Sequence, residues 1–330
     1  NNSYLLQDYP SALTQYQQIL DQFSSSPTRK ELTEKAHFGL AWTYLKSGQL
    51  EQAIAHFQQI MDQSESKTVK VSALVQIADA YHDINNLEKA VEIYDHILKD
   101  YPDSPYVDYA QFRQGIVLMK QENVDAALIS FKSLENNFPK SKYLNDTKYF
   151  LGVAYFKKDN WATAQEYIEK YLKNSQDSPM EFAAEANYVL ALCAFNLNDP
   201  KRALKIFEQV VKTYPDEPAI LRNSEKGIAE CLYKIGDTKA AVEKFNSIIQ
   251  THPDSSIAQE SMIWLGNYYM ETADFPTAAQ KFEEFLSRYP NSEKINEAHY
   301  QLGKIYENRR EFEKALNQYK SVNAPEEDEL

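Results

Sequence analysis

Small and aromatic residues recur along the chain with a period of about 37 residues. One repeat position is always alanine: Ala12, Ala53, Ala90, Ala127, Ala164, Ala203, Ala241, Ala278 and Ala315. Four residues later stands an aromatic residue, except at Ile168: Tyr16, Phe57, Tyr94, Phe131, Phe207, Phe245, Phe282 and Tyr319. Another position carries only small residues: Ala41, Ala78, Gly115, Gly152, Ala191, Ala229, Gly266 and Gly303. Because small side chains let helix backbones approach and rings fill the space beside them, this pattern predicts packed helix pairs.

Prolines and serines fall in phase with this pattern and mark its boundaries. Five prolines share one position of the repeat: Pro102, Pro139, Pro215, Pro253 and Pro290. Serine follows two residues later in four of these copies, and we expect it to cap the next helix, since serine is a favourable N-cap. Each repeat is therefore expected to hold a helix of about 16 residues, a short turn and a second helix of about 14 residues.

These boundaries predict an all-α chain without a separate globular domain. We expect a solenoid over residues 1–322 and an acidic tail at 323–330. The solenoid would begin with a partial repeat at 1–26, and the following repeats are expected at 27–66, 67–103, 104–140, 141–177, 178–216, 217–254, 255–291 and 292–322.

The composition narrows the classes of partner. Net charge is −13, which argues against a generic nucleic-acid binder, because such proteins need basic surface to replace counterions. No apolar run approaches the roughly 20 residues of a membrane-spanning helix. The chain begins NNSYLL without an initiator methionine, which indicates a processed or shortened chain, so the lack of a signal sequence carries no information.

The repeat resembles the tetratricopeptide repeat, a helix–turn–helix unit with small residues at the helix crossing, a late alanine, an aromatic four residues on and a closing proline. The resemblance implies a right-handed superhelical solenoid of antiparallel helix pairs. Phrases such as YPDSPYVDYAQF and YPNSEKINEAHYQLG are similar to those of long-repeat tetratricopeptide proteins of the Gram-negative cell envelope. Examples are the lipoprotein of the β-barrel assembly machinery and the tetratricopeptide protein of the Tol–Pal system.

Motifs for catalysis, cofactors and metals are absent from the sequence. No phosphate-cradling glycine loop occurs, and the histidines do not form a metal-ligand spacing. Cys193 and Cys231 occupy equivalent repeat positions, and we interpret them as small residues of a helix interface rather than as a redox pair. We therefore expect no enzyme activity, no cofactor and no metal.

The resemblance implies that the first helices of the repeats line a concave face that binds a peptide or helix of a partner. Three repeat positions spaced by four and three residues share one helical face. In the middle of the chain they are apolar or aromatic: Phe112, Ile116, Met119, Tyr149, Val153, Phe156, Tyr188, Leu192, Phe195 and Tyr233. Lysines follow at the next position: Lys120, Lys157 and Lys234. We predict that these thirteen residues contact a protein or peptide partner.

Alternatives to this prediction stay open. The same aromatic residues could be buried by tight winding of the solenoid. The chain could also be an arm or spacer that binds through its ends or convex face, or the recruiting region of a longer enzyme. Its ends lack polar capping helices, so self-association through them is possible. The resemblance implies a periplasmic or outer-membrane-associated protein, and a cytoplasmic location is the alternative.

Overall fold

The computed structural model describes residues 8–23, 29–173 and 180–322. These residues form seventeen helices and no strand, so the predicted all-α class is confirmed. The expected tail at 323–330 lies outside the described residues. The first helices of the repeats are α3 (Lys30–Lys46), α5 (Lys67–Asp83), α7 (Val107–Lys120), α9 (Leu144–Lys157), α11 (Ala183–Asn196), α13 (Pro218–Ile235), α15 (Ser256–Glu271) and α17 (Ile295–Asn308). The second helices are α2 (Tyr9–Phe23), α4 (Leu50–Gln63), α6 (Leu87–Asp100), α8 (Val124–Asn137), α10 (Trp161–Lys173), α12 (Pro200–Thr213), α14 (Thr238–Thr251), α16 (Phe275–Arg288) and α18 (Phe312–Lys320).

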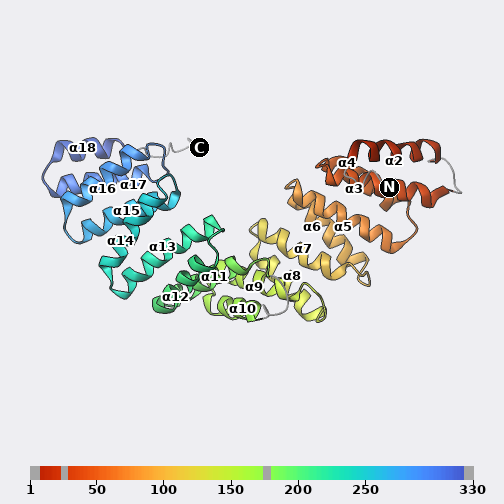
Figure 1. Cartoon of the computed structure of the whole chain (residues 1–330), viewed down its shortest axis with the longest axis horizontal. Helices are drawn as coiled ribbons and strands as arrows, with labels where there is room; N and C mark the ends of the chain where they lie inside the picture. Colours follow the sequence, from red (N-terminus) through yellow and green to blue (C-terminus); the bar gives the residue numbers. More distant parts are fainter. Residues whose placement is uncertain (1–7, 24–28, 174–179, 323–330) are drawn as a thin grey trace, which may run out of the picture. The chain divides into compact units, whose positions relative to one another are not determined.

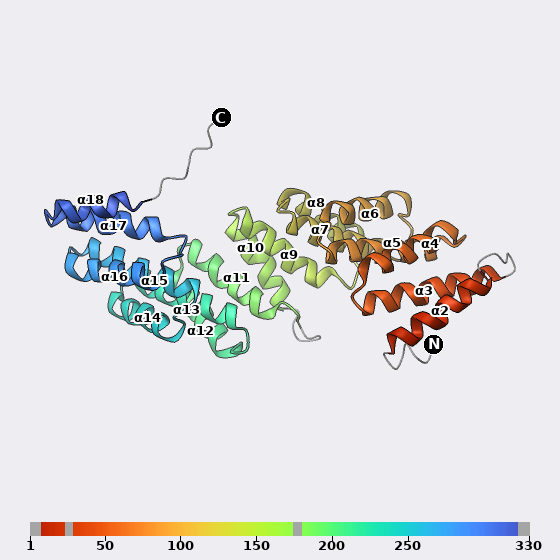
Figure 2. The same cartoon turned by 90° about the horizontal axis from the view of Figure 1, so that it is seen from above.

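The helices group into two compact units, with the boundary between Ser178 and Pro179 (Figure 1). Unit 1 contains α2 to α10, and unit 2 contains α11 to α18. Within each unit, consecutive helices lie side by side and run in opposite directions (Figure 2). The fold is therefore a stack of antiparallel helix pairs in each unit.

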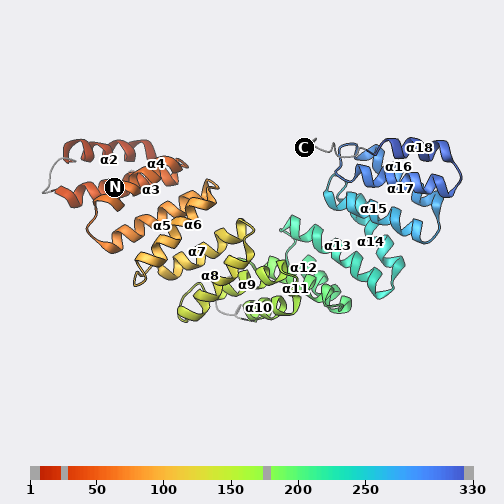
Figure 3. The same ribbon diagram turned by 180° about the vertical axis from the view of Figure 1, so that it is seen from behind.

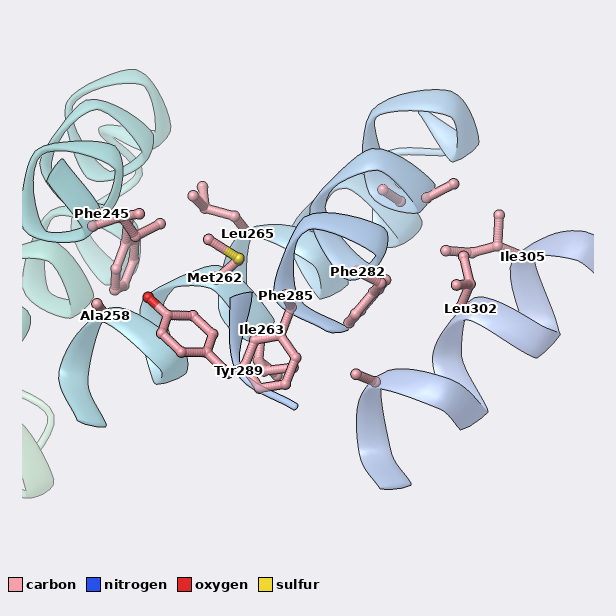
Figure 4. Close-up of a cluster of buried hydrophobic side chains, with 14 of the residues drawn as sticks. Phe245, Ala258, Met262, Ile263, Leu265, Phe282, Phe285, Tyr289, Leu302 and Ile305 are labelled. Atoms are coloured by element: carbon pink, nitrogen blue, oxygen red, sulfur yellow. The ribbon is translucent and has the colours of Figure 1, made fainter. Parts of the chain in front are cut away.

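Packing of small residues against rings holds each helix pair together. A Cβ atom added to Gly115 would lie 2.4 Å from the ring of Phe131, which is closer than real atoms approach. A Cβ atom added to Gly266 would likewise lie 2.6 Å from the ring of Phe282. In the largest cluster of unit 2, Phe282 and Phe285 of α16 lie between side chains of α15 and α17 (Figure 4). The alternation of small and aromatic positions thus forms the core that the sequence predicts.

The turn between the two helices of a repeat requires a left-handed backbone residue. Glycine fills this position at Gly48 and Gly236, where φ is 76° and 98°. Six other repeats carry a residue with a Cβ atom there, at φ between 56° and 63°: Asn85, Glu122, Asp159, Asn198, Ala273 and Arg310. The left-handed conformation costs these residues free energy, because Cβ crowds the carbonyl oxygen.

Only some of the serines that follow the proline-marked turns cap the next helix directly, as predicted. Ser255 caps α15 directly, and its hydroxyl accepts the amide N–H of Ala258 at 3.1 Å. Ser104 and Ser141 instead accept the N–H of the residue two positions on, and the helix begins one residue after that. A short extra turn therefore precedes these helices, and the prediction of a direct serine cap was wrong there.

The first helices lie on the inner side of each unit. In unit 1, α7 approaches both α5 and α9, and in unit 2 α13 approaches α11 and α15 (Figure 3). No comparable approach is found between successive second helices of the described part of the chain. Since helices on the inner side of a curved stack are crowded together, the first helices line the inner face of each unit.

Candidate partner-binding site

Two of the predicted contact residues in unit 1 are buried. Phe112 has 7% of its surface exposed, and its ring stacks on that of Tyr143 with centroids 5.1 Å apart. Phe112 also meets the ring of Phe150 edge-on at 5.7 Å. Tyr149 is 8% exposed and lies against Tyr171 and Phe150. Phe112 thus joins α7 to α9, and Tyr149 joins α9 to α10. Both side chains stabilise the packing of the helices that carry the inner face.

The remaining predicted residues of unit 1 reach the surface. Ile116 and Met119 of α7 are half-buried and cover the cluster around Phe131. Val153 and Phe156 of α9 are half-buried as well. On α7 and α9, the accessible apolar residues of the predicted set are therefore four side chains from two neighbouring helices.

Two cations border this apolar surface. Lys120 and Lys157 are exposed at the last turns of α7 and α9, directly after Met119 and Phe156. Neither lysine has a carboxylate partner within residues 29–173. Because lysine at a helix C-terminus also favours the helix dipole, both side chains have a structural role without any ligand.

In unit 2 the predicted residues lie on α11 and α13. Tyr188, Leu192 and Phe195 are half-buried and pack against the cluster around Phe207. The ammonium of Lys234 lies 4.2 Å from the centre of the Phe195 ring, a cation–π contact. Lys234 therefore partly covers Phe195 instead of standing free beside it.

Tyr233 is the most accessible of the predicted aromatic residues, with 39% of its surface exposed. Its ring meets the edge of Trp264 at 5.0 Å. Trp264 in turn lies between Phe245, at 4.0 Å, and Tyr268, at 5.5 Å, in a continuous stack. The sequence prediction included Tyr233 but missed this supporting stack, because Trp264 and Tyr268 occupy other positions of the repeat.

A charged network in unit 1 was also not anticipated. Asp79 of α5 forms an ion pair with Nε of Arg113 at 2.9 Å and accepts hydrogen bonds from the hydroxyls of Tyr94 and Tyr109. Burial raises the pKa of both tyrosines, and the Asp79 carboxylate raises it further, so both remain donors. The pair of Asp79 and Arg113 was not visible in the sequence because the two residues lie 34 positions apart.

The network lies beside a recess of about 330 Å³ between the middle of α5, the N-terminal end of α7 and the turn before α9. Its walls include Val75, Tyr109, Lys142 and Tyr143. Tyr143 thus contributes to this recess and also covers Phe112. The recess is a further place on unit 1 where a side chain of a partner could insert.

The inner face of unit 2 carries a charge cluster instead. Nζ of Lys226 lies 2.6 Å from Glu260 of the next first helix and 3.4 Å from Glu230 of its own helix. Burial alone would lower the pKa of Lys226, but the two carboxylates outweigh burial and raise it. This part of unit 2 is therefore polar, unlike the apolar surface of α7 and α9.

The side chains that could bind a metal or act as nucleophiles do not form a cluster in the described residues. No group of three or more histidine, cysteine or carboxylate side chains within the described ranges could hold a metal ion. Cys193 and Cys231 are free and buried, and burial raises the pKa of the Cys231 thiol to about 12. A thiol with so high a pKa is a poor nucleophile at neutral pH.

Comparison with known proteins identifies the family. The family model described as outer membrane lipoprotein, YfiO, matches residues 109–218 and 225–326, which is more than half of the chain. The chain belongs to the YfiO family. Two tetratricopeptide-repeat models match residues 3–66 and 44–112. The resemblance to tetratricopeptide proteins of the cell envelope is thus confirmed for this YfiO-family chain. A search of the curated proteins finds no match.

Solved structures show the same fold. A tetratricopeptide repeat protein from Parabacteroides merdae is 14% identical with a TM-score of 0.57, and the match covers 87% of this chain and 100% of that one. The C-terminal part of a tetratricopeptide repeat protein from Cytophaga hutchinsonii is 15% identical with a TM-score of 0.58. That match covers 78% of this chain and 97% of the other. The predicted tetratricopeptide solenoid is therefore confirmed, while identities this low carry no information on function.

Among the helices of residues 8–23, 29–173 and 180–322, none combines the length and the hydropathy needed to cross a bilayer.

Proposed function

We propose that the chain is a non-enzymatic interaction scaffold of a bacterial cell-envelope assembly, and that the inner faces of its units bind a peptide or helix of a partner protein. The tetratricopeptide fold, which generally serves protein–protein interaction, supports the coarser part of this proposal. The match to a family described as outer membrane lipoprotein supports the envelope location.

The observation that carries the binding site is the apolar surface of α7 and α9. Ile116, Met119, Val153 and Phe156 reach the inner face of unit 1 from two adjacent helices. An apolar strip of this kind accepts the apolar face of an amphipathic helix. In unit 2, Tyr233 of α13 presents an exposed ring of its own.

Lys120 and Lys157 favour a partner segment with acidic residues beside its apolar anchors. The two lysines have no carboxylate partner among residues 29–173, although the chain as a whole is strongly acidic. Acidic groups on a partner would gain charge-assisted contacts there, while the remaining surface repels them. The selectivity of the site would thus come from its charge as well as from its shape.

Site-specific photocrosslinking in a Gram-negative host tests the binding site. A photoreactive phenylalanine analogue replaces Phe156 on the inner face, or Ile129 on α8, where 69% of the side-chain surface is exposed. We expect discrete crosslinked proteins from position 156 and none from the matched control at 129. Equal products from both positions would contradict the proposed site.

Charge substitutions on the same face give a second test. Met119→Asp should weaken the crosslink formed from position 156, with the helical circular dichroism unchanged, because Met119 is half-buried at the surface of its cluster. Lys120→Glu together with Lys157→Glu should weaken it too if the partner is acidic there. An unchanged crosslink in both variants would exclude this inner face as the site.

Cell fractionation of the natural full-length protein tests the location. We expect the tagged protein in the periplasmic or outer-membrane fraction. Recovery with the cytoplasmic markers would contradict the proposed envelope role and would leave the inner-face site to be judged by crosslinking alone.

A further inference from the structure

The last two helices of unit 2 expose large apolar side chains. Six large hydrophobic residues of the described chain are exposed, and three of them lie on α17 and α18: Tyr300 at 50%, Phe312 at 65% and Leu316 at 53%. Phe312 and Leu316 are one helical turn apart, so they form a single apolar strip along α18.

Equivalent positions in earlier repeats show what normally covers such a strip. Val91 of α6 corresponds to Leu316, and it packs against the cluster that contains Phe112 of α7. Val242 of α14 likewise packs against the cluster built around α15. In interior repeats the first helix of the next repeat covers the strip, whereas residues 180–322 provide no such cover for α18.

An acidic and a basic residue border the α18 strip at its two ends. Glu313 and Lys320 are seven residues apart, and therefore lie two turns apart on the same side of the helix. Neither has an ion-pair partner within residues 180–322, whereas Lys314 is paired with Glu311. A helix with an acid near its start and a base near its end is complementary to an antiparallel copy of itself.

We propose that α18 is a self-association surface, on which the helix pairs antiparallel with α18 of a second copy of the chain. In this arrangement Leu316 lies close to the two-fold axis, and Glu313 faces Lys320 of the partner subunit. The contact is isologous, so each charge pair forms twice. None of the predicted inner-face residues belongs to α18, so this proposal does not depend on the inner-face site.

The size of the surface sets the strength of the dimer. A helix of nine residues with two exposed apolar anchors offers much less than the roughly 800 Å² per partner of a standard interface. We therefore expect a dimer that forms at high protein concentration and dissociates on dilution.

Sedimentation velocity over a range of protein concentrations tests the proposal. The unchanged chain should show a concentration-dependent monomer–dimer equilibrium, and Leu316→Glu should remain monomeric throughout. Ile129→Glu is the matched control, because Ile129 on α8 is even more exposed than Leu316 and its substitution should leave the equilibrium unchanged. A monomer at every concentration would overturn the proposal.

Charge reversal distinguishes the antiparallel pairing from unspecific apolar contact. Glu313→Lys alone, or Lys320→Glu alone, places like charges opposite each other and should weaken the dimer roughly tenfold. The double variant E313K/K320E restores opposite charges and should recover the original dissociation constant. Failure of the double variant to recover association would exclude the proposed pairing.

Shortening the chain after Val322 tests the competing occupant, which is the acidic segment 323–330. Self-association of similar strength in the full and shortened chains supports the proposal. Association that appears only in the shortened chain would assign the α18 strip to the tail and overturn the proposal.

Discussion

The ring of Phe112 stacks on the ring of Tyr143, with centroids 5.1 Å apart and planes 13° from parallel. Tyr143 belongs to the turn before α9 and lies over the inner face of α7. Phe156, which the same repeat pattern places on that face, has no ring contact in the described part of the chain and is half-buried. Two aromatic residues that the sequence places on one face therefore have different roles.

We predict that this difference appears in stability. Phe112→Ala should lower the free energy of unfolding by about 3–5 kcal/mol, because it leaves a cavity among buried rings. Phe156→Ala should lower it by about 1 kcal/mol or less, since little packing is lost. Urea unfolding followed by circular dichroism measures both values, and equal losses would contradict the assignment.

The left-handed turn position offers a stabilising substitution. Ala273→Gly should raise the free energy of unfolding by about 1 kcal/mol, because Ala273 has φ of 62° and glycine adopts this conformation without steric cost. The matched reverse change is Gly236→Ala, at φ of 98°, which should destabilise the chain. Thermal unfolding of both variants checks the prediction, and a lower melting temperature for Ala273→Gly would refute it.

Stability should fall below neutral pH because of a histidine pair in unit 1. Nδ1 of His37 lies 3.0 Å from Nδ1 of His56. Burial, with a smaller contribution from His37, lowers the pKa of His56 from 6.5 to about 4, and burial also lowers that of His37. Between about pH 6.5 and pH 4 the unfolded chain therefore binds protons that the folded chain does not, so folding loses stability as the pH falls.

Urea midpoints at a series of pH values between 7 and 4 measure this effect. His56→Gln should flatten the decline, whereas His96→Gln should leave it in place, because His96 lies 42% exposed at the end of α6. An undiminished decline in His56→Gln would exclude the pair as its source.

The Asp79 network should be sensitive to loss of its single carboxylate. Asp79→Asn leaves Arg113, whose side chain is 21% exposed, without its counter-charge and should cost about 2–3 kcal/mol. Asp125→Asn is the control, since Asp125 is 76% exposed in its ion pair with Lys158 and its loss should cost about 0.5 kcal/mol or less. Chemical denaturation of the two variants compares them, and similar losses would show that the network contributes little.

Much of the fold could be predicted because it repeats. Ala127 and Phe131 are separated by one helical turn, and the same pair recurs in almost every repeat, so the second helix and its core face follow from spacing alone. The candidate site was predicted less completely. Spacing places Phe112 and Phe156 on one face, but the burial of Phe112 depends on Tyr143, which comes from a turn in the next repeat.

The sequence by itself determined the all-helical class, the helix pairs and the residues that share one face of each first helix. Each of these depends on local periodicity, which recurs in almost every repeat. Only the tertiary structure decided which side chains of that face are accessible, that Lys234 lies over Phe195, and that Asp79 holds Arg113. These contacts join residues of neighbouring repeats, and their geometry depends on how closely adjacent helices pack. The apolar strip on α18 needed both sources of information. The sequence pattern predicts an apolar position there, and the structure shows that no described helix covers it.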